Sequence, residues 1–434
     1  MKKLCVCLFL SIAGIAVYGQ PGSALLSKLD QQAKEIQPKV IQWRREFHEH
    51  PELSNQEFKT GKLIAEFLKS LGLEVQYPVA RTGVVAILKG SKPGPVIALR
   101  ADMDALPVNE RNSLPFTSKE KATLNGVETG VMHACGHDSH MAILMGVAEV
   151  LSKNKNELKG TVKFIFQPAE ETYPIDQDAG AVLMVKEGVL DNPKVDVIFG
   201  LHIQSLLPSG QLAYRAEGLM AAVDGFDIKV SGVGAHGATP WDAVDPIVVS
   251  GQILVGLQTI VSRQINLTNA PAVITVGSIH GGIRRNIIPE EVIMQGTIRT
   301  FDMSMQKSIH EKIKQLATSI AAASGAKAEV LINPESPLTY NDPKLTAKMT
   351  SSLVRTVGEQ NTKIIAPVTM AEDFSFYQEK IPGLFFFLGA YPADMSLTKA
   401  PVHHTADFMI DEKSFVTGVR AMLNLTVDYM FMKN

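Results

Sequence analysis

The chain has 434 residues, of which 45% are hydrophobic, and a formal net charge of -2. This length and apolar content suit a soluble protein of two or three domains with sizeable cores. The near-neutral charge disfavours nucleic acid or an anionic membrane surface as a partner.

The N-terminal segment predicts export. Lys2 and Lys3 precede an apolar run at 4–17, and small residues follow around Gly19. This pattern is typical of a signal peptide at residues 1–19, and the apolar run is short for a membrane span. An uncleaved anchor is the alternative. We find no later segment long and apolar enough to cross a bilayer, so we expect a periplasmic or secreted protein without stable membrane insertion.

Cleavage would leave a single cysteine. Cys5 and Cys7 lie in the leader, and Cys135 alone remains in the mature chain. No internal disulfide is then available to an exported protein. A lone thiol in an oxidising compartment has to be buried or bound to something.

Helical segments and short apolar strands alternate through most of the chain. Helices are expected at 26–47, in the segment ending at Gly72, at 139–151 and at 180–187. Strands are expected in "VVAIL", "VIALRADMDALP", "TVKFIFQPAEE", "VDVIFGLHIQ", "IIAPVTMAEDF" and "GLFFFLGAYP". This alternation predicts an α/β domain with a largely buried sheet.

Between residues 222 and 333 the order changes. A strand "FDIKVSG", a helix at 243–264, strands "AVITVGSI" and "VIMQGTIRTF", a helix at 303–324 and a strand "KAEVLI" follow one another. The order β-α-β-β-α-β is that of the ferredoxin-like unit. We therefore expect a domain at 217–335 inserted into a discontinuous domain of residues 20–216 and 336–434.

Polar side chains follow the predicted strands at their carboxyl ends, which is where ligands bind in open α/β sheets. Around them the sequence supplies thiolate, imidazole and carboxylate groups, the donors that first-row transition metals prefer. These residues are Asp102, Asp104, His133, Cys135, His137, Asp138, His140, Glu170, Glu171, His202, Glu372, Asp373, His403 and His404.

Each group alone has a structural explanation. The pair Glu170 and Glu171 could stabilise a helix N-terminus, Cys135 could be a small buried hydrophobe, and His202 a core histidine. Their arrival at one edge of a single predicted sheet favours a metal site instead. More than four ligand-type residues suggests two ions, which lower the pKa of a water and polarise a carbonyl. One of the two glutamates can then hold metal while the other moves the proton.

The motifs resemble a known family. "RREFHEHPELSNQE", "LRADMDALPV", "MHACGHDSHM", "FQPAEE", "GLHIQ", "GVGAHGATP", "RRNIIPE", "MAEDFSFY" and "HHTADFMIDE" occur in order over nearly the whole mature chain. Together they resemble the metallopeptidase family of bacterial hippurate hydrolases, aminoacylase-like carboxypeptidases and plant auxin-conjugate amidohydrolases. The resemblance implies a zinc-peptidase-like three-layer α/β catalytic domain with an inserted ferredoxin-like dimerisation or lid domain.

The resemblance also implies site residues. Two divalent ions, Zn²⁺ or Mn²⁺ with Co²⁺ or Ni²⁺ possible, would share a cysteine or a solvent oxygen between them. The implied ligands are Cys135, His137, Glu171, His202 and His404. His404 is preferred to His403 because "HTADF" matches the family's spacing, with a histidine four residues before a phenylalanine. Glu170 would be the general base and later the acid, and Asp104 would orient the ligands, a role that Asp102 could share.

The inserted domain would complete the site of a partner subunit. In the family, the histidine corresponding to His236 reaches that site and helps bind the oxyanion. Asn286 and Arg299 would hold the substrate's carboxylate, since an arginine fork matches a carboxylate bidentately. The segment "TYPIDQDA" at 172–179 is longer than the family's Gly-rich link, and Tyr173 or Asp176 could alter substrate preference.

We therefore expect an exported, homodimeric, metal-dependent amidohydrolase that releases an amino acid from an N-acyl amino acid or a short peptide. A dipeptidase or aminopeptidase acting on unblocked peptides is the nearest alternative, and it would need an acid for the substrate ammonium. A non-catalytic metal or peptide binder on the same scaffold is the alternative from another class.

Overall fold

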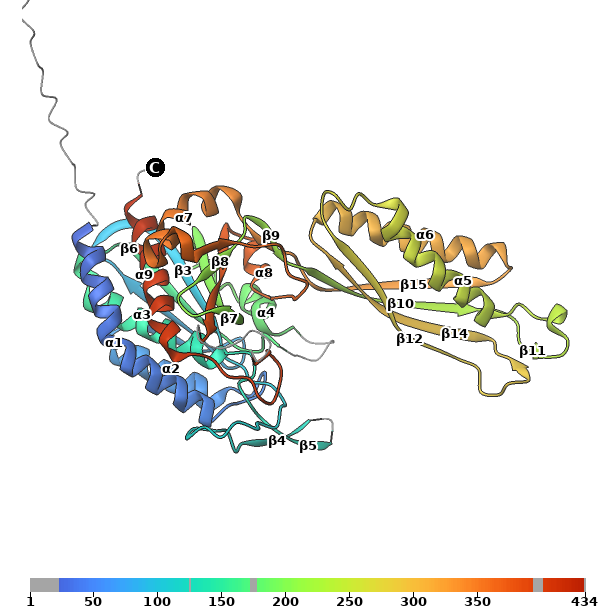
Figure 1. The fold of residues 1–434 in the computed structure, drawn as a ribbon, viewed down its shortest axis with the longest axis horizontal. Coiled ribbons are helices and arrows are strands. Elements are labelled where there is room, and N and C mark those ends of the chain that lie inside the picture. Colours follow the sequence, from blue (N-terminus) through green and yellow to red (C-terminus); the bar gives the residue numbers. More distant parts are fainter. Residues whose placement is uncertain (1–22, 125, 172–177, 393–400, 433–434) are drawn as a thin grey trace, which may run out of the picture.

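The computed structural model describes residues 23–124, 126–171, 178–392 and 401–432. The predicted signal peptide lies outside these residues, and so do Tyr173 and Asp176 of the 172–179 segment. Figure 1 shows two lobes, a larger domain and a slender inserted domain that projects from it.

The larger domain is built on a mixed sheet. Among the described residues its strand order is β1-β2-β6-β3-β7-β18-β8-β17, and the central strands β6, β3, β7 and β18 run parallel to one another. The strands are β1 (Glu74–Val79), β2 (Gly83–Lys89), β3 (Lys92–Asp102), β6 (Lys159–Gln167), β7 (Val197–Pro208), β8 (Leu212–Tyr214), β17 (Thr362–Ile364) and β18 (Gly383–Tyr391).

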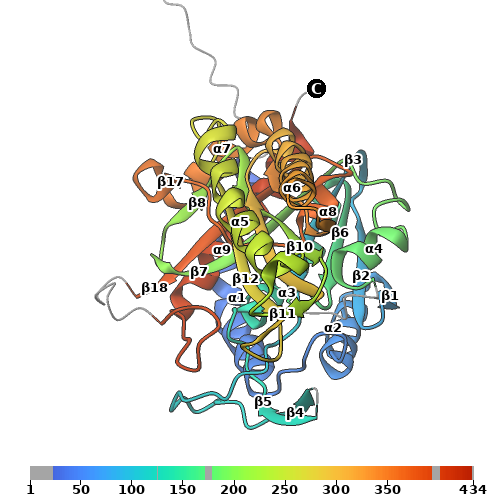
Figure 2. The ribbon, with the colours of Figure 1, turned by 90° about the vertical axis from the view of Figure 1, so that its right-hand side faces the viewer.

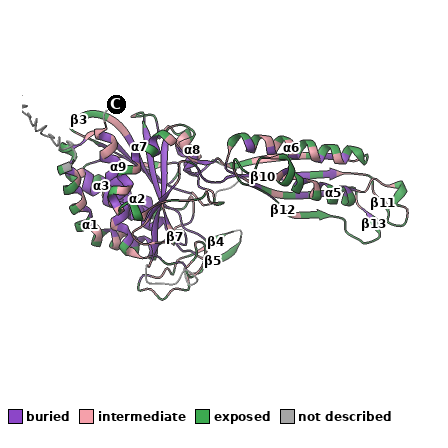
Figure 3. Ribbon diagram, turned by 45° about the horizontal axis from the view of Figure 1, so that its top comes forward, coloured by how far each residue is buried: buried purple, intermediate pink, exposed green. Residues whose placement is uncertain are grey.

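Helices cover both faces of this sheet. One face carries α1 (Ser23–Glu49), α2 (Phe58–Ser70), α3 (His137–Lys153), α7 (Pro343–Val357) and α9 (Phe415–Phe431). The other carries α4 (Gly180–Lys186) and α8 (Ser375–Gln378). Because both faces are covered, every residue of β18 is buried, as expected for a central strand in such a sheet. The predicted three-layer α/β class is confirmed, and Figure 3 shows its buried centre.

The inserted domain has a four-stranded antiparallel sheet with the order β12-β14-β10-β15. Its elements are β10 (Ala222–Ser231), α5 (Pro246–Thr259), β12 (Ala272–Gly281), β14 (Glu291–Thr300), α6 (Met303–Ala323) and β15 (Lys327–Ser336). Both helices lie on one face of the sheet (Figure 2), which is the ferredoxin-like arrangement predicted. Asp245 and Asp302 accept backbone N–H groups at the starts of α5 and α6, which explains where these helices begin.

Short strand pairs complete the fold. A hairpin of β4 (Lys121–Leu124) and β5 (Val127–Gly130) projects from the larger domain. Strands β9 (Glu217–Met220) and β16 (Thr339–Asn341) pair where the chain passes between the domains. At the far end of the inserted domain, β11 (Ala235–His236) pairs with β13 (Ile287–Ile288).

Two expectations from the sequence are wrong. The stretch Pro246–Gln264, α5 with a π-helical turn, does have the length and composition of a membrane span. A single helix of this kind is weak evidence of a membrane span, because core helices of globular proteins can have the same length and composition. Val249, Ile253 and Leu257 of this helix pack in the core of the inserted domain.

The second error concerns "IIAPVTMAEDF". It contains no strand except the end of β17, which is an edge strand of the sheet. Pro367 cannot donate a ladder hydrogen bond, and after it only Val368 forms an isolated β-bridge, with Met220. Glu372 and Asp373 therefore reach the site from a loop before α8, and not from the carboxyl end of a strand.

Candidate metal centre

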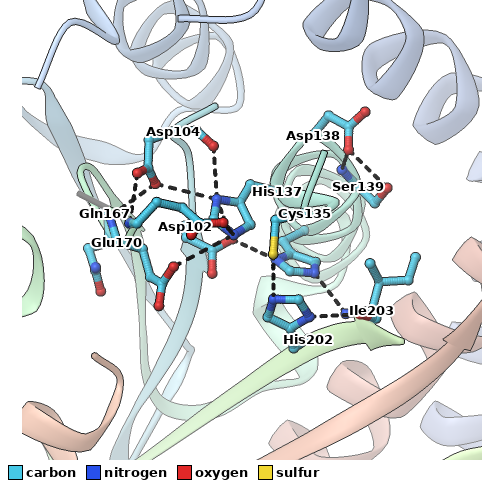
Figure 4. Close-up of polar contacts among 12 residues, drawn as sticks. Asp102, Asp104, Cys135, His137, Asp138, Ser139, Gln167, Glu170, His202 and Ile203 are labelled. Atoms are coloured by element: carbon cyan, nitrogen blue, oxygen red, sulfur yellow. Dashed lines mark hydrogen bonds and ion pairs between the residues drawn. The ribbon is translucent and has the colours of Figure 1, made fainter. Parts of the chain in front are cut away.

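The site lies where β3, β6 and β7 meet the N-terminus of α3. Asp102 ends β3 and pairs with Gln167 at the end of β6. His202 lies on β7 two residues after Gly200, which pairs with Arg100 of β3. The buried strands thus place the loops after β3 and β6, and the side chain of His202, around one point (Figure 4).

The five predicted ligands come together there in two groups that share Cys135. One group joins Cys135, His137 and His202, and the other joins Cys135, Glu171 and His404, with the donor atoms of each group within 4.8 Å of one another. Cys135 Sγ lies 3.4 Å from His202 Nε2 and 3.3 Å from His404 Nε2. Cys135 belongs to both groups, so its sulfur would contribute to holding a cation at either of them.

Hydrogen bonds leave the Nε2 atoms of two histidines free to bind metal. His137 Nδ1 lies 2.8 Å from the backbone oxygen of Asp104, and His202 Nδ1 lies 2.7 Å from that of Ile203. A backbone oxygen only accepts, so each Nδ1 carries a proton, and in the neutral ring the Nε2 lone pair is the one offered to a cation. His137 Nε2 is buried without a hydrogen-bond partner, as expected of an atom that binds a cation.

The environments of His403 and His404 differ. His403 Nε2 accepts the amide of Ser205 at 3.0 Å, and His403 Nδ1 lies 3.2 Å from the Cys135 oxygen, so both ring nitrogens are occupied. Burial lowers the pKa of His403 to about 3, which keeps the ring neutral. His404 Nε2 instead lies 3.1 Å from Glu171 Oε1. The geometry favours His404 as the ligand.

The site collects buried negative charge. Arg100, fully buried, forms ion pairs with Asp102, Glu372 and Asp373. Burial, and after it the charges of neighbouring carboxylates, raises the pKa of Glu170 and that of the Cys135 thiol well above their usual values. Cations at these donors would offset that charge and favour the thiolate, so the residues present fit a metal centre.

Asp102 and Asp104, whose roles the sequence does not separate, have different contacts. Asp104 accepts the backbone amides of Glu170 at 3.0 Å and Glu171 at 2.9 Å, so it holds both glutamates. Asp102 Oδ1 lies 2.6 Å from His140 Nδ1, and His140 Nε2 accepts the amide of Ile203 at 2.8 Å. Asp102 therefore acts on β7 through His140.

Sequence reasoning missed Arg100 and Gly136. The arginine inside the apolar strand "VIALRAD" could have indicated a cluster of buried carboxylates, because a buried guanidinium needs carboxylate partners. Gly136, between two predicted ligands, has φ +101°, and a Cβ there would lie 2.3 Å from Ile203 Cγ2. The turn that presents Cys135 and His137 thus requires glycine.

The predicted site residues of the inserted domain, His236, Asn286 and Arg299, are not part of this group of donors. His236 and Asn286 are exposed at its far end, where Gly237 N donates to Asn286 O at 2.9 Å, beside a groove of about 890 Å³. Arg299 pairs with Val223 at the opposite end of β14. At about 3.3 Å per residue, Asn286 and Arg299 are on the order of 30 Å apart. One protomer does not bring them together on one carboxylate.

A three-layer α/β domain with cysteine, histidine and glutamate donors at its strand ends is the architecture of a metallohydrolase. A family model described as peptidase family M20/M25/M40 matches residues 98–428. The chain belongs to this family, as the resemblance of its motifs implied.

The relatives are hydrolases by name. Thermostable carboxypeptidase 2 of Saccharolobus solfataricus is 41% identical over 409 residues, covering 93% of this chain and 99% of the relative. N-acetyl-L-cysteine deacetylase of Bacillus subtilis is 40% identical over 384 residues, covering 88% and 86%. A Bacillus subtilis structure described as a dinuclear metal-binding peptidase from the M20 family has a TM-score of 0.75 and 36% identity, covering 92% of this chain and 99% of the other. The protein is a metal-dependent hydrolase of amides.

Proposed function

We propose that the protein is an exported, dinuclear amidohydrolase that releases an amino acid from an N-acyl amino acid or from the C-terminus of a short peptide. The observation that carries the proposal is the pair of donor groups joined at Cys135, with Glu170 beside them. The names of the deacetylase and carboxypeptidase relatives support this substrate class.

The residues of the chain have distinct tasks in this reaction. Divalent cations at the donors supply Lewis acidity, which lowers the pKa of a nearby water and polarises an amide carbonyl. Glu170 Oε2 lies 3.9 Å from His137 Nε2, next to the donors. Glu170 takes the proton from the attacking water and delivers it to the leaving amine. Asp104 keeps the Glu170 backbone in place through its amide.

Turnover of a substrate panel tests this function. Metal-analysed wild-type protein should hydrolyse acylated amino acids, while unblocked dipeptides should react more slowly. Glu170→Gln should retain two ions per protomer and lose about 10²-fold to 10⁴-fold in kcat. Faster hydrolysis of unblocked dipeptides would favour the dipeptidase alternative. Full activity of Glu170→Gln would contradict the role of Glu170.

A second copy of the chain would supply His236 and Asn286 to the active site of the first. His236 Nδ1 accepts the amide of Ala238 at 3.0 Å, so Nε2 carries the proton and can donate to an oxyanion. His236 lies on β11 at the end of the inserted domain distant from the larger domain (Figure 1), which supports action on a partner's site. Arg299, near the larger domain, would contact the substrate carboxylate from its own protomer.

Mixed dimers test this arrangement. His236→Ala and Glu170→Gln should each be inactive, yet a mixture refolded together should regain about a quarter of wild-type activity. Half of random dimers are hybrids, and each hybrid has one intact site. His236→Ala mixed with the double variant His236→Ala/Glu170→Gln should regain nothing. If His236→Ala and Glu170→Gln together stay inactive, His236 does not act across subunits.

Export is supported by the sequence alone. The mature protein from the native host should begin at residue 20, as N-terminal sequencing of the exported fraction would reveal. A chain beginning at Met1 and retained with the membrane would favour the uncleaved anchor.

A further inference from the structure

The backbone that carries the two glutamates has an unusual conformation. Ala169, which is fully buried, has φ +50°, in the left-handed region that residues other than glycine rarely adopt. Its amide and the next two amides all donate to carboxyl groups. Ala169 N donates to Glu57 Oε1 at 2.8 Å, and Asp104 accepts the amides of Glu170 and Glu171. Such consecutive amides form a concave anion-binding turn.

Glu57 is placed for this contact and does not cap its own helix. It occupies the N-cap position of α2, where a side chain ordinarily accepts an amide of the first turn, but it makes no such bond. Glu52 takes that role, since its carboxylate accepts Lys59 N at 3.3 Å and Thr60 N at 2.8 Å. The Glu57 side chain is thereby free to reach Ala169.

The Glu57 carboxyl group is held on its other side as well. Thr82 Oγ1 donates to Glu57 Oε2 at 2.7 Å, and Glu57 has no exposed surface. Ser54, in the same segment, donates to Asp104 Oδ2 at 2.6 Å. The segment before α2 therefore supports all three amides, although it lies more than 100 residues earlier in the chain.

We propose that Glu57 is a positioning residue for Glu170, fixing the left-handed turn at Ala169 from which the Glu170 side chain projects. The proposal rests on the proposed role of Glu170 as the base. Without an acceptor, the buried Ala169 amide has no partner, and the turn relaxes toward a conformation with negative φ. The Glu170 carboxylate then moves relative to the reacting atoms, and a displacement of about 1 Å can cost on the order of 100-fold in rate.

Glutamine is a suitable conservative replacement at position 57. Burial, followed by the charge of Asp104, raises the pKa of Glu57 to about 8, so the side chain is mostly uncharged at pH 7. The amide oxygen of glutamine can accept Ala169 N, and its NH₂ group can donate to the Thr82 hydroxyl. Leucine fills a similar volume without an acceptor, and aspartate is one methylene too short to reach.

The experiment compares kcat, KM and bound metal for Glu57→Gln, Glu57→Leu and Glu57→Asp on an acylated amino acid that the wild-type protein hydrolyses. We expect Glu57→Leu and Glu57→Asp to lower kcat about tenfold to hundredfold. KM should stay within about twofold and both ions should remain, because no ligand is removed. Glu57→Gln should restore most of kcat. If Glu57→Leu does not fold, Glu57→Asp, which keeps the polar group, carries the test.

Glu52→Leu is the matched control, because it removes a carboxylate that accepts backbone amides in the same segment but does not touch residues 169–171. It should lower the melting temperature and leave kcat unchanged. Unchanged kcat in Glu57→Leu and Glu57→Asp would overturn the proposal, as would loss of metal as the cause of inactivity. Equal losses in Glu57→Gln and Glu57→Leu would also overturn it. An active Glu170→Gln refutes the proposed base itself and is a separate outcome.

Discussion

At the scale of single residues, hydrogen bonds separate side chains that look equivalent in the sequence. His403 and His404 are adjacent, yet backbone groups occupy both ring nitrogens of His403, whereas His404 Nε2 faces Cys135 and Glu171. His404 also has φ +61°, in the left-handed region that residues other than glycine rarely adopt. Such a conformation costs free energy, and it occurs here at a predicted metal ligand.

Replacing each histidine should have a different effect. His404→Ala should lower the metal content from two ions toward one per protomer and reduce kcat at least about 100-fold, because one donor group loses a member. His403→Ala leaves the Ser205 amide unpaired, so we expect about 1–3 kcal/mol of destabilisation with the metals retained. Metal analysis and thermal unfolding of both variants check this. Metal loss only in His403→Ala would reverse the assignment.

At the scale of elements, the N-terminus of α3 places two of the predicted ligands, Cys135 and His137, one residue apart on either side of Gly136. The helix begins at His137, directly after Gly136. The turn that ends at Gly136 and the first residue of the helix therefore both determine where the donor atoms lie. The close approach of Gly136 to Ile203 also ties α3 to β7, which carries His202. The packing of Gly136 against Ile203 thus fixes the position of α3 relative to β7 at the metal centre.

Gly136→Ala should disturb this junction. The left-handed φ and the contact with Ile203 should together cost about 1–3 kcal/mol, and metal affinity should fall because Cys135 and His137 flank the change. Chemical unfolding and titration with a divalent ion measure both effects. Gly251→Ala is the control: Gly251 lies in α5, and a Cβ added there would have nothing within 4 Å, so this variant should be about 0.5–1 kcal/mol more stable.

At the scale of the whole molecule, the inserted domain exposes apolar surface that its own chain does not cover. Val255 on α5 is 67% exposed, Val273 and Ile279 on β12 are 43% and 49% exposed, and Ile283 in the end loop is fully exposed. β12 is also an edge strand. Exposed apolar side chains beside a free edge favour association. These features support the proposed homodimer through the inserted domain.

A lysine on this surface should weaken the dimer and the activity together. Val255→Lys should shift sedimentation toward the monomer and lower kcat, since a monomer lacks the partner's His236 under the proposed arrangement. Val127→Lys is matched in exposure, at 67%, but lies on the β4–β5 hairpin, so it should change neither property. A monomeric Val255→Lys variant with full activity would show that the partner is unnecessary for catalysis.

The sequence by itself determined the family, the α/β class, the ferredoxin-like insertion and the candidate donors. Buried strands appear in the sequence as apolar runs, and the polar residues that follow them lie at one edge of the sheet. Asp102, Glu170 and His202 could therefore be assigned to one site from the sequence. That reasoning failed for "IIAPVTM", because apolar content alone does not distinguish a strand from an irregular loop around a proline.

Only the tertiary structure decided how those residues divide their tasks. Which nitrogen of a histidine has a lone pair, and whether Asp102 or Asp104 holds the glutamates, depends on hydrogen bonds between segments far apart in the chain. Glu57 acts on Ala169 across 112 positions. The separation of Asn286 from Arg299 follows from the length of β14. Local pattern carries no information on such distances, because folding sets them through contacts that no short stretch of sequence contains.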